Sequence, residues 1–187
     1  MKRFSTLAVA LAAAVCASAA SADTLNFDAL PAAELGSTAL NLPQATITGA
    51  GNDLYNLKNF YFTDQGGAIC SLNGFFTCEA DLTIDFTAPV SGLTFQTVGY
   101  DAGDSVTIRV YAGATLLGSD TVTSNRLVDF SAYSGVTRLF FDDSSTGAGY
   151  GYGKFSFTAA VPEPQTYALM LAGLATLGWA ARRRQRG

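Results

Sequence analysis

Apolar and polar residues alternate with a period of two along several stretches of the chain, and this alternation constrains the fold more than any other feature. In residues 81–87 every second position is leucine, isoleucine or phenylalanine. The same alternation recurs in residues 105–110 and 154–158. Because successive side chains of a β-strand point to opposite faces, these stretches predict strands with one buried and one solvated face.

Other β-rich stretches are separated by turn signals, and no helical period persists between the two terminal regions. The further predicted strands are residues 24–28, 45–48, 59–63, 93–98, 114–123, 127–130 and 137–141. The turn signals are Ser91-Gly92, Asp101-Ala102-Gly103, Ala112-Gly113, Ser134-Gly135 and residues 142–149. A sheet with one apolar face needs a second layer to cover it. About ten short strands therefore predict an all-β, antiparallel jelly-roll or Greek-key β-sandwich, with an up-and-down barrel as the alternative.

Residues 1–22 have the pattern of a secretory signal peptide. A basic dipeptide precedes the apolar run 7–15, which is too short to span a bilayer, and Ala20-Ser21-Ala22 is a small-x-small cleavage site. A lipoprotein signal at Cys16 is the alternative, but the residue before this cysteine is not small. The sequence therefore predicts export, with the mature chain starting near residue 23.

Residues 161–187 combine a proline-rich joint, an apolar run and a basic end. Pro162 and Pro164 fix their own φ angles and favour extended backbone at the residues before them. Residues 164–181 carry no charge, and as a helix they would span roughly 27 Å, close to the hydrocarbon thickness of a bilayer. The arginines that follow predict, by the positive-inside rule, a cytoplasmic C-terminus. A plain single-span anchor is the alternative.

These three parts, in this order, resemble the PEP-CTERM sorting signal of exopolysaccharide-producing Gram-negative bacteria. The resemblance implies recognition by an exosortase, a membrane cysteine protease that cleaves near the motif. It also implies that residues 165–181 lie transiently in the inner membrane, with the preceding domain in the periplasm, before transfer to the cell surface or extracellular matrix. The matching sorting-motif and stop-transfer residues are Pro162, Glu163, Pro164, Arg182, Arg183 and Arg184.

Residues 23–160, between the signal peptide and the tail, are predicted to form one β-sandwich domain. They hold five basic and fourteen acidic residues, a net charge of −9. A surface this negative excludes nucleic acid as a partner, because that binding requires lysine and arginine to displace counterions. It suits an exported domain that meets divalent cations.

Cys70 and Cys78 are the only cysteines after the signal peptide, and export predicts that they form a disulfide. The intervening Asn73-Gly74 favours a hairpin. A two-residue turn there would place Cys70 opposite Thr77, so cysteines that face each other require a loop of three or five residues centred on Gly74, or a bulge. The closed loop would stabilise the fold by about 2.5 kcal/mol.

The chain contains no histidine. This excludes a serine–histidine–acid triad and a histidine-built zinc site, and a disulfide would remove thiol catalysis as well. We therefore expect a non-catalytic cell-surface or matrix protein without a cofactor. A carboxylate-based glycoside hydrolase is one alternative, because two acids suffice for that reaction.

Two acidic loops contain side chains of the type that Ca²⁺ prefers. Their oxygen ligands would come from Asp101, Asp104, Asp142 and Asp143. Neither loop matches a defined calcium-binding pattern, and aspartates also form turns by bonding to their own backbone. Calcium is therefore a weak hypothesis.

Glycine and tyrosine alternate in residues 147–153. Tyr150 and Tyr152 could stack on a sugar ring, which would make the domain an exopolysaccharide-binding module, the other functional alternative. They could equally pack across neighbouring strands. Other candidate exposed aromatic residues are Tyr55, Tyr61, Tyr100 and Tyr111.

Overall fold

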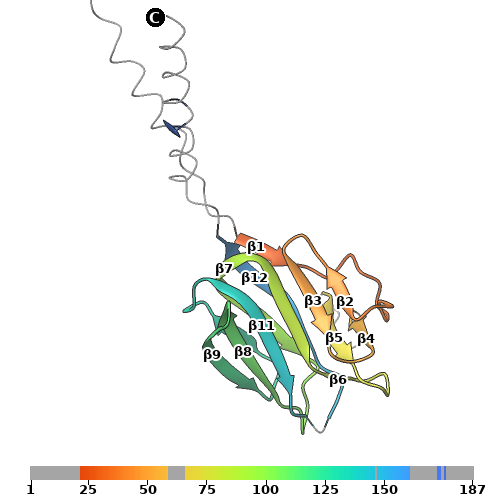
Figure 1. Ribbon diagram of the computed structural model, residues 1–187. Coiled ribbons are helices and arrows are strands. Elements are labelled where there is room, and N and C mark those ends of the chain that lie inside the picture. Colours follow the sequence, from red (N-terminus) through yellow and green to blue (C-terminus); the bar gives the residue numbers. More distant parts are fainter. Residues whose placement is uncertain (1–21, 59–65, 146, 161–171, 174, 176–187) are drawn as a thin grey trace, which may run out of the picture. The chain divides into compact units, whose positions relative to one another are not determined.

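The folded part of the chain is a β-domain, shown in Figure 1 as a computed structural model. The structure describes residues 22–58, 66–145 and 147–160, together with Ala172, Gly173 and Ala175. Residues 21–160 form one compact unit. The predicted signal peptide, the predicted strand at residues 59–63 and nearly all of the sorting tail lie outside the described residues.

Twelve β-strands make up the regular structure of the described domain. They are β1 (Ala22–Leu25), β2 (Ala39–Asn41), β3 (Ala45–Gly49), β4 (Asp53–Asn56), β5 (Ala68–Leu72), β6 (Cys78–Ala80), β7 (Leu82–Val98), β8 (Val106–Ala112), β9 (Thr115–Val122), β10 (Leu127–Phe130), β11 (Val136–Asp143) and β12 (Gly151–Ala159). Their ladders are antiparallel. The predicted all-β, antiparallel class is confirmed, whereas the jelly-roll or Greek-key topology stays a prediction.

The long strand β7 connects the two halves of the domain. Its first part, residues 82–86, pairs with β3 on one side and with β11 on the other. Its second part, residues 90–98, pairs with β12 on one side and with β10 on the other. Strand β7 therefore leaves one set of strands and enters another.

These pairings define two layers that share β7, an arrangement like that of a β-sandwich. One layer runs β2, β3, β7, β11, β8 and β9. The other runs β10, β7, β12, β5 and β4, with β1 also paired to β12 and β6 to β5. In Figure 1, β12 passes behind the layer that contains β11 and β8.

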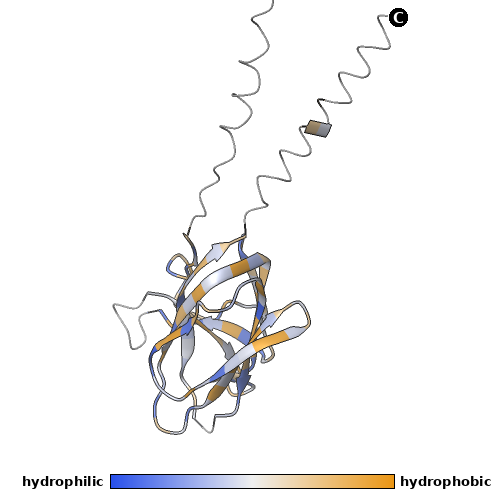
Figure 2. Ribbon diagram, turned by 90° about the vertical axis from the view of Figure 1, so that its left-hand side faces the viewer, coloured by the Kyte–Doolittle hydropathy of each residue, from blue (hydrophilic) through white to orange (hydrophobic). Residues whose placement is uncertain are grey.

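The hydrophobic core lies between the two layers. The ring of Phe95 on β7 is fully buried and stacks on Phe155 of β12, with 4.8 Å between ring centroids. Phe141 of β11 meets Phe95 edge-on at 5.7 Å. Along β8 every second residue is buried and the residues between are partly exposed, as the sequence predicts. Figure 2 shows the resulting change between hydrophobic and hydrophilic residues along the strands.

The predicted turn at Ser91-Gly92 is wrong, because β7 continues through it. Gly92 has a φ of 64°, in the left-handed region that glycine adopts without steric penalty. A bend at this position lets the strand change its partners without ending. The sequence shows the glycine but not whether a strand stops or bends there.

Candidate functional site

Tyr150 and Tyr152 lie inside the domain rather than on its surface. Only 2% of Tyr150 and 3% of Tyr152 is exposed. The Tyr152 ring packs on Phe141 with 4.0 Å between centroids, and its hydroxyl lies 3.3 Å from that of Tyr100. Burial raises the pKa of both the Tyr150 and Tyr152 hydroxyls above the usual range. Of the two readings of these rings, the structure shows packing between strands, and buried rings of this kind are not exposed for stacking on a sugar.

The glycines beside these tyrosines lie on the opposite face of β12, where there is no room for a side chain. A Cβ on Gly151 would lie 2.7 Å from the Cδ1 atom of Leu57, and one on Gly153 would lie 2.8 Å from the carbonyl oxygen of Gly67. Glycine therefore allows a neighbouring strand to approach β12 closely. The alternation of glycine and tyrosine is visible in the sequence, but which face is buried depends on the packing of distant strands.

The four aspartates predicted as calcium ligands differ in burial and in bonding partners. Asp142 forms an ion pair of 2.6 Å with an arginine of β8, and Asp143 accepts a hydrogen bond of 2.8 Å from the backbone N–H of Ser145. Asp101 is exposed, whereas Asp104 is buried. Within the described parts of the domain, no three acidic or cysteine side chains come together as a metal-ligating group.

Asp104 is the most buried of these carboxylates, with 2% of the residue exposed. Its Oδ2 atom accepts a hydrogen bond of 2.8 Å from the backbone N–H of Asp101. Its Oδ1 atom has no hydrogen-bond partner among the described residues. Burial raises the pKa of the Asp104 carboxyl, the bond from Asp101 offsets part of this effect, and the charges of Asp101, Asp143 and Glu79 add to it.

We expect Asp104→Asn to raise the melting temperature at neutral pH, because it removes a buried charge. A raised pKa in the folded state means that stability is greatest below the unfolded-state pKa and falls as the pH rises through the folded-state pKa. The amide removes the buried charge and keeps an oxygen for the N–H of Asp101. Thermal melts at pH 7 and at about pH 4 check this, because the gain should shrink at the lower pH. An equal loss of stability at both pH values would contradict it.

Cys70 and Cys78 form the predicted disulfide, with Cα atoms 5.5 Å apart. Between β5 and β6 the register shifts, and Leu72 pairs with Cys78 across the loop of residues 73–77. The predicted odd-membered loop and the bulge are confirmed. The prediction that the cysteines face each other directly is wrong, because the bulge moves Cys78 opposite Leu72.

The loop is centred on Phe75 and not on Gly74, because the side chain of Asn73 organises it. The Asn73 Oδ1 atom accepts hydrogen bonds from the backbone N–H groups of Phe75 and Thr77, at 2.8 and 3.2 Å. Phe76, rather than a glycine, adopts a left-handed backbone with a φ of 59°. Phe75 and Phe76 are 87% and 63% exposed.

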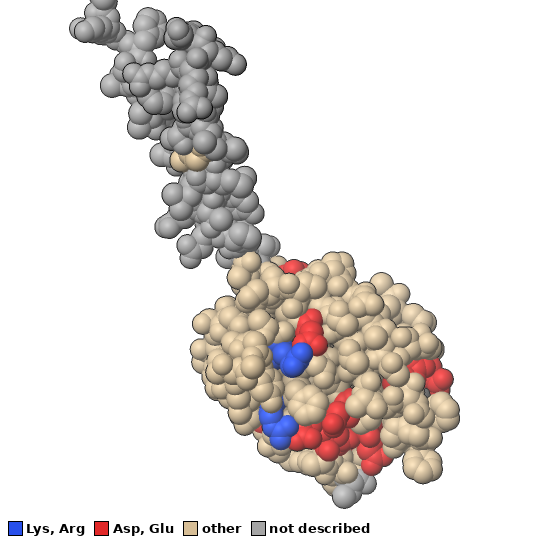
Figure 3. All heavy atoms as spheres, viewed as in Figure 1, with Lys and Arg blue, Asp and Glu red and all other residues tan. Residues whose placement is uncertain are grey.

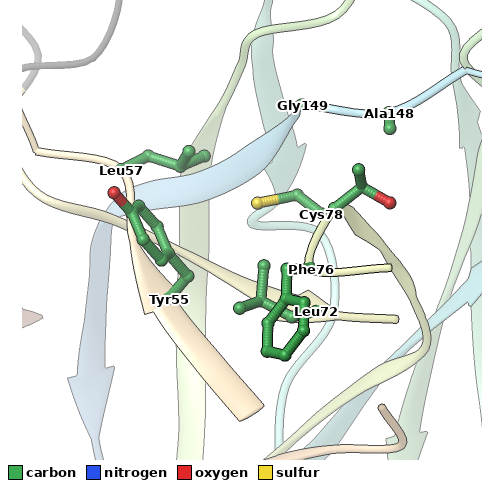
Figure 4. Close-up of a pocket in the computed structure, with 8 residues that line it drawn as sticks. Tyr55, Leu57, Leu72, Phe76, Cys78, Ala148 and Gly149 are labelled. Carbon is green, nitrogen blue, oxygen red and sulfur yellow. The ribbon is translucent and has the colours of Figure 1, made fainter. Parts of the chain in front are cut away.

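An apolar pocket of about 310 Å³ lies beside this loop. In Figure 4, Tyr55 and Leu57 line one side of the pocket, and Phe76 and Leu72 lie across from them. The side-chain hydroxyls in the lining belong to Tyr55 and Thr77. Because the lining has so few hydrogen-bonding groups, the pocket fits an apolar ligand better than a ligand with many hydroxyls.

A second hollow, of about 560 Å³, lies on the outward face of the layer formed by β3, β7, β11 and β8. We call it the sheet-face groove. Its lining includes Thr48, Thr83, Asp85, Tyr111, Arg138 and Phe140. These residues occupy the polar-face positions of the alternating pattern, so their side chains point away from the core.

Two cross-strand ion pairs order the side chains on this face. Arg138 donates from Nε to Asp85 Oδ1, and Arg109 donates from Nη2 to Asp142 Oδ2, each at 2.6 Å. The Arg109 guanidinium also lies over the ring of Phe140, 5.8 Å from its centroid. In Figure 3 the basic groups on the visible face adjoin acidic ones. Pairing of this kind holds the guanidinium groups in place and cancels their charge locally.

Only part of this face could be predicted from the sequence. Tyr111 is among the candidate exposed aromatic residues, and its side chain is half-buried at the edge of the groove. Phe140, Arg138 and Asp85 were not predicted as site residues. Phe140 could have been predicted, because it is an aromatic residue at a position of β11 where the alternating pattern expects a polar one.

The tail matches a known sorting motif. Residues 160–184 match the PEP-CTERM protein-sorting motif, which confirms the resemblance. The chain is therefore an antiparallel β-domain protein with a PEP-CTERM sorting motif at its C-terminal end.

The β-domain itself has a weaker likeness among solved structures. One is described as the structure of a family two carbohydrate esterase from Cellvibrio japonicus, with a TM-score of 0.37 and 11% sequence identity. The alignment covers 78% of this chain and 36% of that one. At this TM-score the likeness carries no argument about function. None of the curated proteins matches this sequence.

The predicted membrane span at residues 165–181 lies outside the described residues except for Ala172, Gly173 and Ala175, which are helical. In the part of the chain that the structure describes, no helix has the length and apolar character needed to cross a bilayer.

Proposed function

We propose that this chain is an exported, non-catalytic protein of the cell surface or extracellular matrix, delivered there by an exosortase. The observation that carries the proposal is the position of the PEP-CTERM motif, residues 160–184, directly after the last strand of the domain, Gly151–Ala159. A protease can act at such a junction without cutting into the β-domain. In this proposal the β-domain is the exported product, and the tail is a sorting signal that the exosortase removes.

Each part of the tail has a physical role in this mechanism. Residues 165–181 enter the inner membrane and hold the motif at its periplasmic surface. Pro162 and Pro164 keep the backbone extended, so that Glu163 is presented to the exosortase in an accessible strand. The arginines at 182–184 stop transfer and keep the C-terminus in the cytoplasm.

Two features favour a non-catalytic domain over a hydrolase. The whole chain lacks histidine, so the commonest general base is missing. Its two mature cysteines are joined in a disulfide and are not available as nucleophiles.

Replacing Arg182, Arg183 and Arg184 together by glutamine is expected to disturb both membrane retention and processing in an exosortase-containing host. Without these three charges, only Arg186 is left to oppose movement of the helix through the bilayer. Cell fractionation and intact-mass measurement give the readout. Arg186→Gln lies outside the matched motif and is the control, with retention and processing expected to stay unchanged. If the triple variant keeps the wild-type fractionation and mature mass, the proposal is wrong.

A further inference from the structure

The sheet-face groove brings together residues from strands that are far apart in the sequence. Across one row, Thr48 of β3 pairs with Thr83 of β7, and Thr83 pairs with Phe140 of β11. Across the next row, Asp85 of β7 pairs with Arg138 of β11, which pairs with Tyr111 of β8. On this surface, threonine hydroxyls, one ion pair and two aromatic rings occupy neighbouring positions of adjacent strands.

The ion pair leaves hydrogen-bonding groups available to a ligand. Arg138 uses only Nε and Asp85 only Oδ1 in the bond that joins their side chains among the described residues. Their side chains are 50% and 43% exposed. The Arg138 Nη groups can therefore donate, and Asp85 Oδ2 can accept, in fixed positions next to each other. Two adjacent hydroxyls match this pattern, because one can accept from the guanidinium while its neighbour donates to the carboxylate.

The aromatic part of the groove adds an apolar surface beside these polar groups. Tyr111 lies next to Arg138 across the β8–β11 ladder. The ring of Phe140 is partly covered by the guanidinium of Arg109, so Tyr111 is the ring better placed to meet a ligand. A sugar ring presents C–H groups on its faces and hydroxyls at its edge, and a groove with both kinds of surface complements it.

The charge of the groove selects among hydroxyl-rich ligands. Asp85 and Arg138 cancel each other, and Arg109 is neutralised by Asp142. Around the groove, residues 23–160 carry a net charge of −9. An acidic polymer would therefore be repelled by the domain and would find no unpaired arginine in this surface. An uncharged polymer meets no such penalty.

We propose that the sheet-face groove binds a segment of neutral polysaccharide, with Tyr111 as the stacking platform and Arg138 and Asp85 as the pair that recognises adjacent hydroxyls. The hollow beside the disulfide loop is the weaker candidate for this ligand, because its lining is mainly apolar. The inference goes beyond the proposed sorting and does not depend on it. A loss of sorting would appear in cell fractionation, and a loss of binding would appear with purified protein.

The test uses the full chain in a detergent without a sugar headgroup, run in native gels that contain dextran, mixed-linkage β-glucan or galactomannan, with alginate as the anionic probe. At least one neutral polymer is expected to retard the protein, and alginate is not. Tyr111→Ala and Arg138→Ala are each expected to weaken the apparent affinity by about tenfold or more. Tyr111→Phe keeps the ring and should stay within about twofold of the wild type.

Phe76→Ala, in the pocket beside the disulfide loop, is the matched control and should bind as the wild type does. Circular dichroism melts confirm that each variant is folded before it is compared. Three results would overturn the proposal. They are retardation by none of the neutral polymers, binding to alginate alone, and loss of binding in Phe76→Ala while Tyr111→Ala still binds.

Discussion

Replacing Phe95 by alanine is expected to lower the free energy of unfolding by about 3–5 kcal/mol. The Phe95 side chain is fully buried where the two layers meet. Its ring stacks on Phe155 at 4.8 Å and meets Phe141 at 5.7 Å and Phe130 at 6.1 Å. Alanine would remove these contacts and leave a cavity between rings that belong to different strands. Since domains of this size are stable by only about 5–15 kcal/mol, the loss would remove a large share of the total.

Urea denaturation followed by far-ultraviolet circular dichroism measures this change. Tryptophan fluorescence does not suit the measurement, because the only tryptophan is Trp179 in the tail. Phe75→Ala makes the same substitution at a ring that is 87% exposed and should change stability by less than about 0.5 kcal/mol. Similar losses in both variants would show that the core does not lie where the structure places it.

Gly51→Ala is expected to lower the free energy of unfolding by about 3 kcal/mol. A Cβ at this position would lie 1.7 Å from the carbonyl oxygen of Leu72 and 2.6 Å from its carbonyl carbon. That oxygen accepts a hydrogen bond of 2.7 Å from the backbone N–H of Asn52, so it cannot move away without breaking a contact between the β3–β4 turn and β5. The clash is with backbone, and no change of rotamer relieves it.

Gly135→Ala is the matched control for this prediction. Gly135 has a φ of 70°, but a Cβ there would meet no atom within 4 Å. Its substitution therefore tests backbone strain without a clash and should cost about 1 kcal/mol. Thermal or urea unfolding of both variants separates the two effects. If Gly51→Ala lowered stability no more than Gly135→Ala does, the turn could not approach β5 as closely as the structure shows.

Some of the protein follows directly from local sequence. Alternation with a period of two depends only on neighbouring residues, so it predicted the strand at residues 81–87 and the buried side of β8 before any tertiary contact was known. The sorting motif at residues 160–184 is also contiguous. Two prolines, the glutamate between them, an apolar run and three arginines are enough to predict it. The disulfide was predicted because Cys70 and Cys78 are the only cysteines after the predicted signal peptide.

Other properties depended on contacts between residues far apart in the chain. The Tyr150 and Tyr152 rings occur in a pattern that suits either a surface platform or a core, and only the packing of β12 against its neighbours placed them inside. Strand β7 runs through Gly92 because new partners on both sides continue its ladder there. No local pattern distinguishes this bend from a turn.

The sheet-face groove shows the same division most clearly. The sequence determined that Thr83, Asp85, Arg138 and Phe140 occupy alternating positions in strands, and therefore which of them can share a face of one strand. Only the tertiary structure decided that β7 and β11 are neighbours in the register that sets Asp85 beside Arg138. The physical reason is that period and turn signals are properties of adjacent residues. The choice of a strand's partner and its register depends on the packing of the whole core, to which every strand contributes at once.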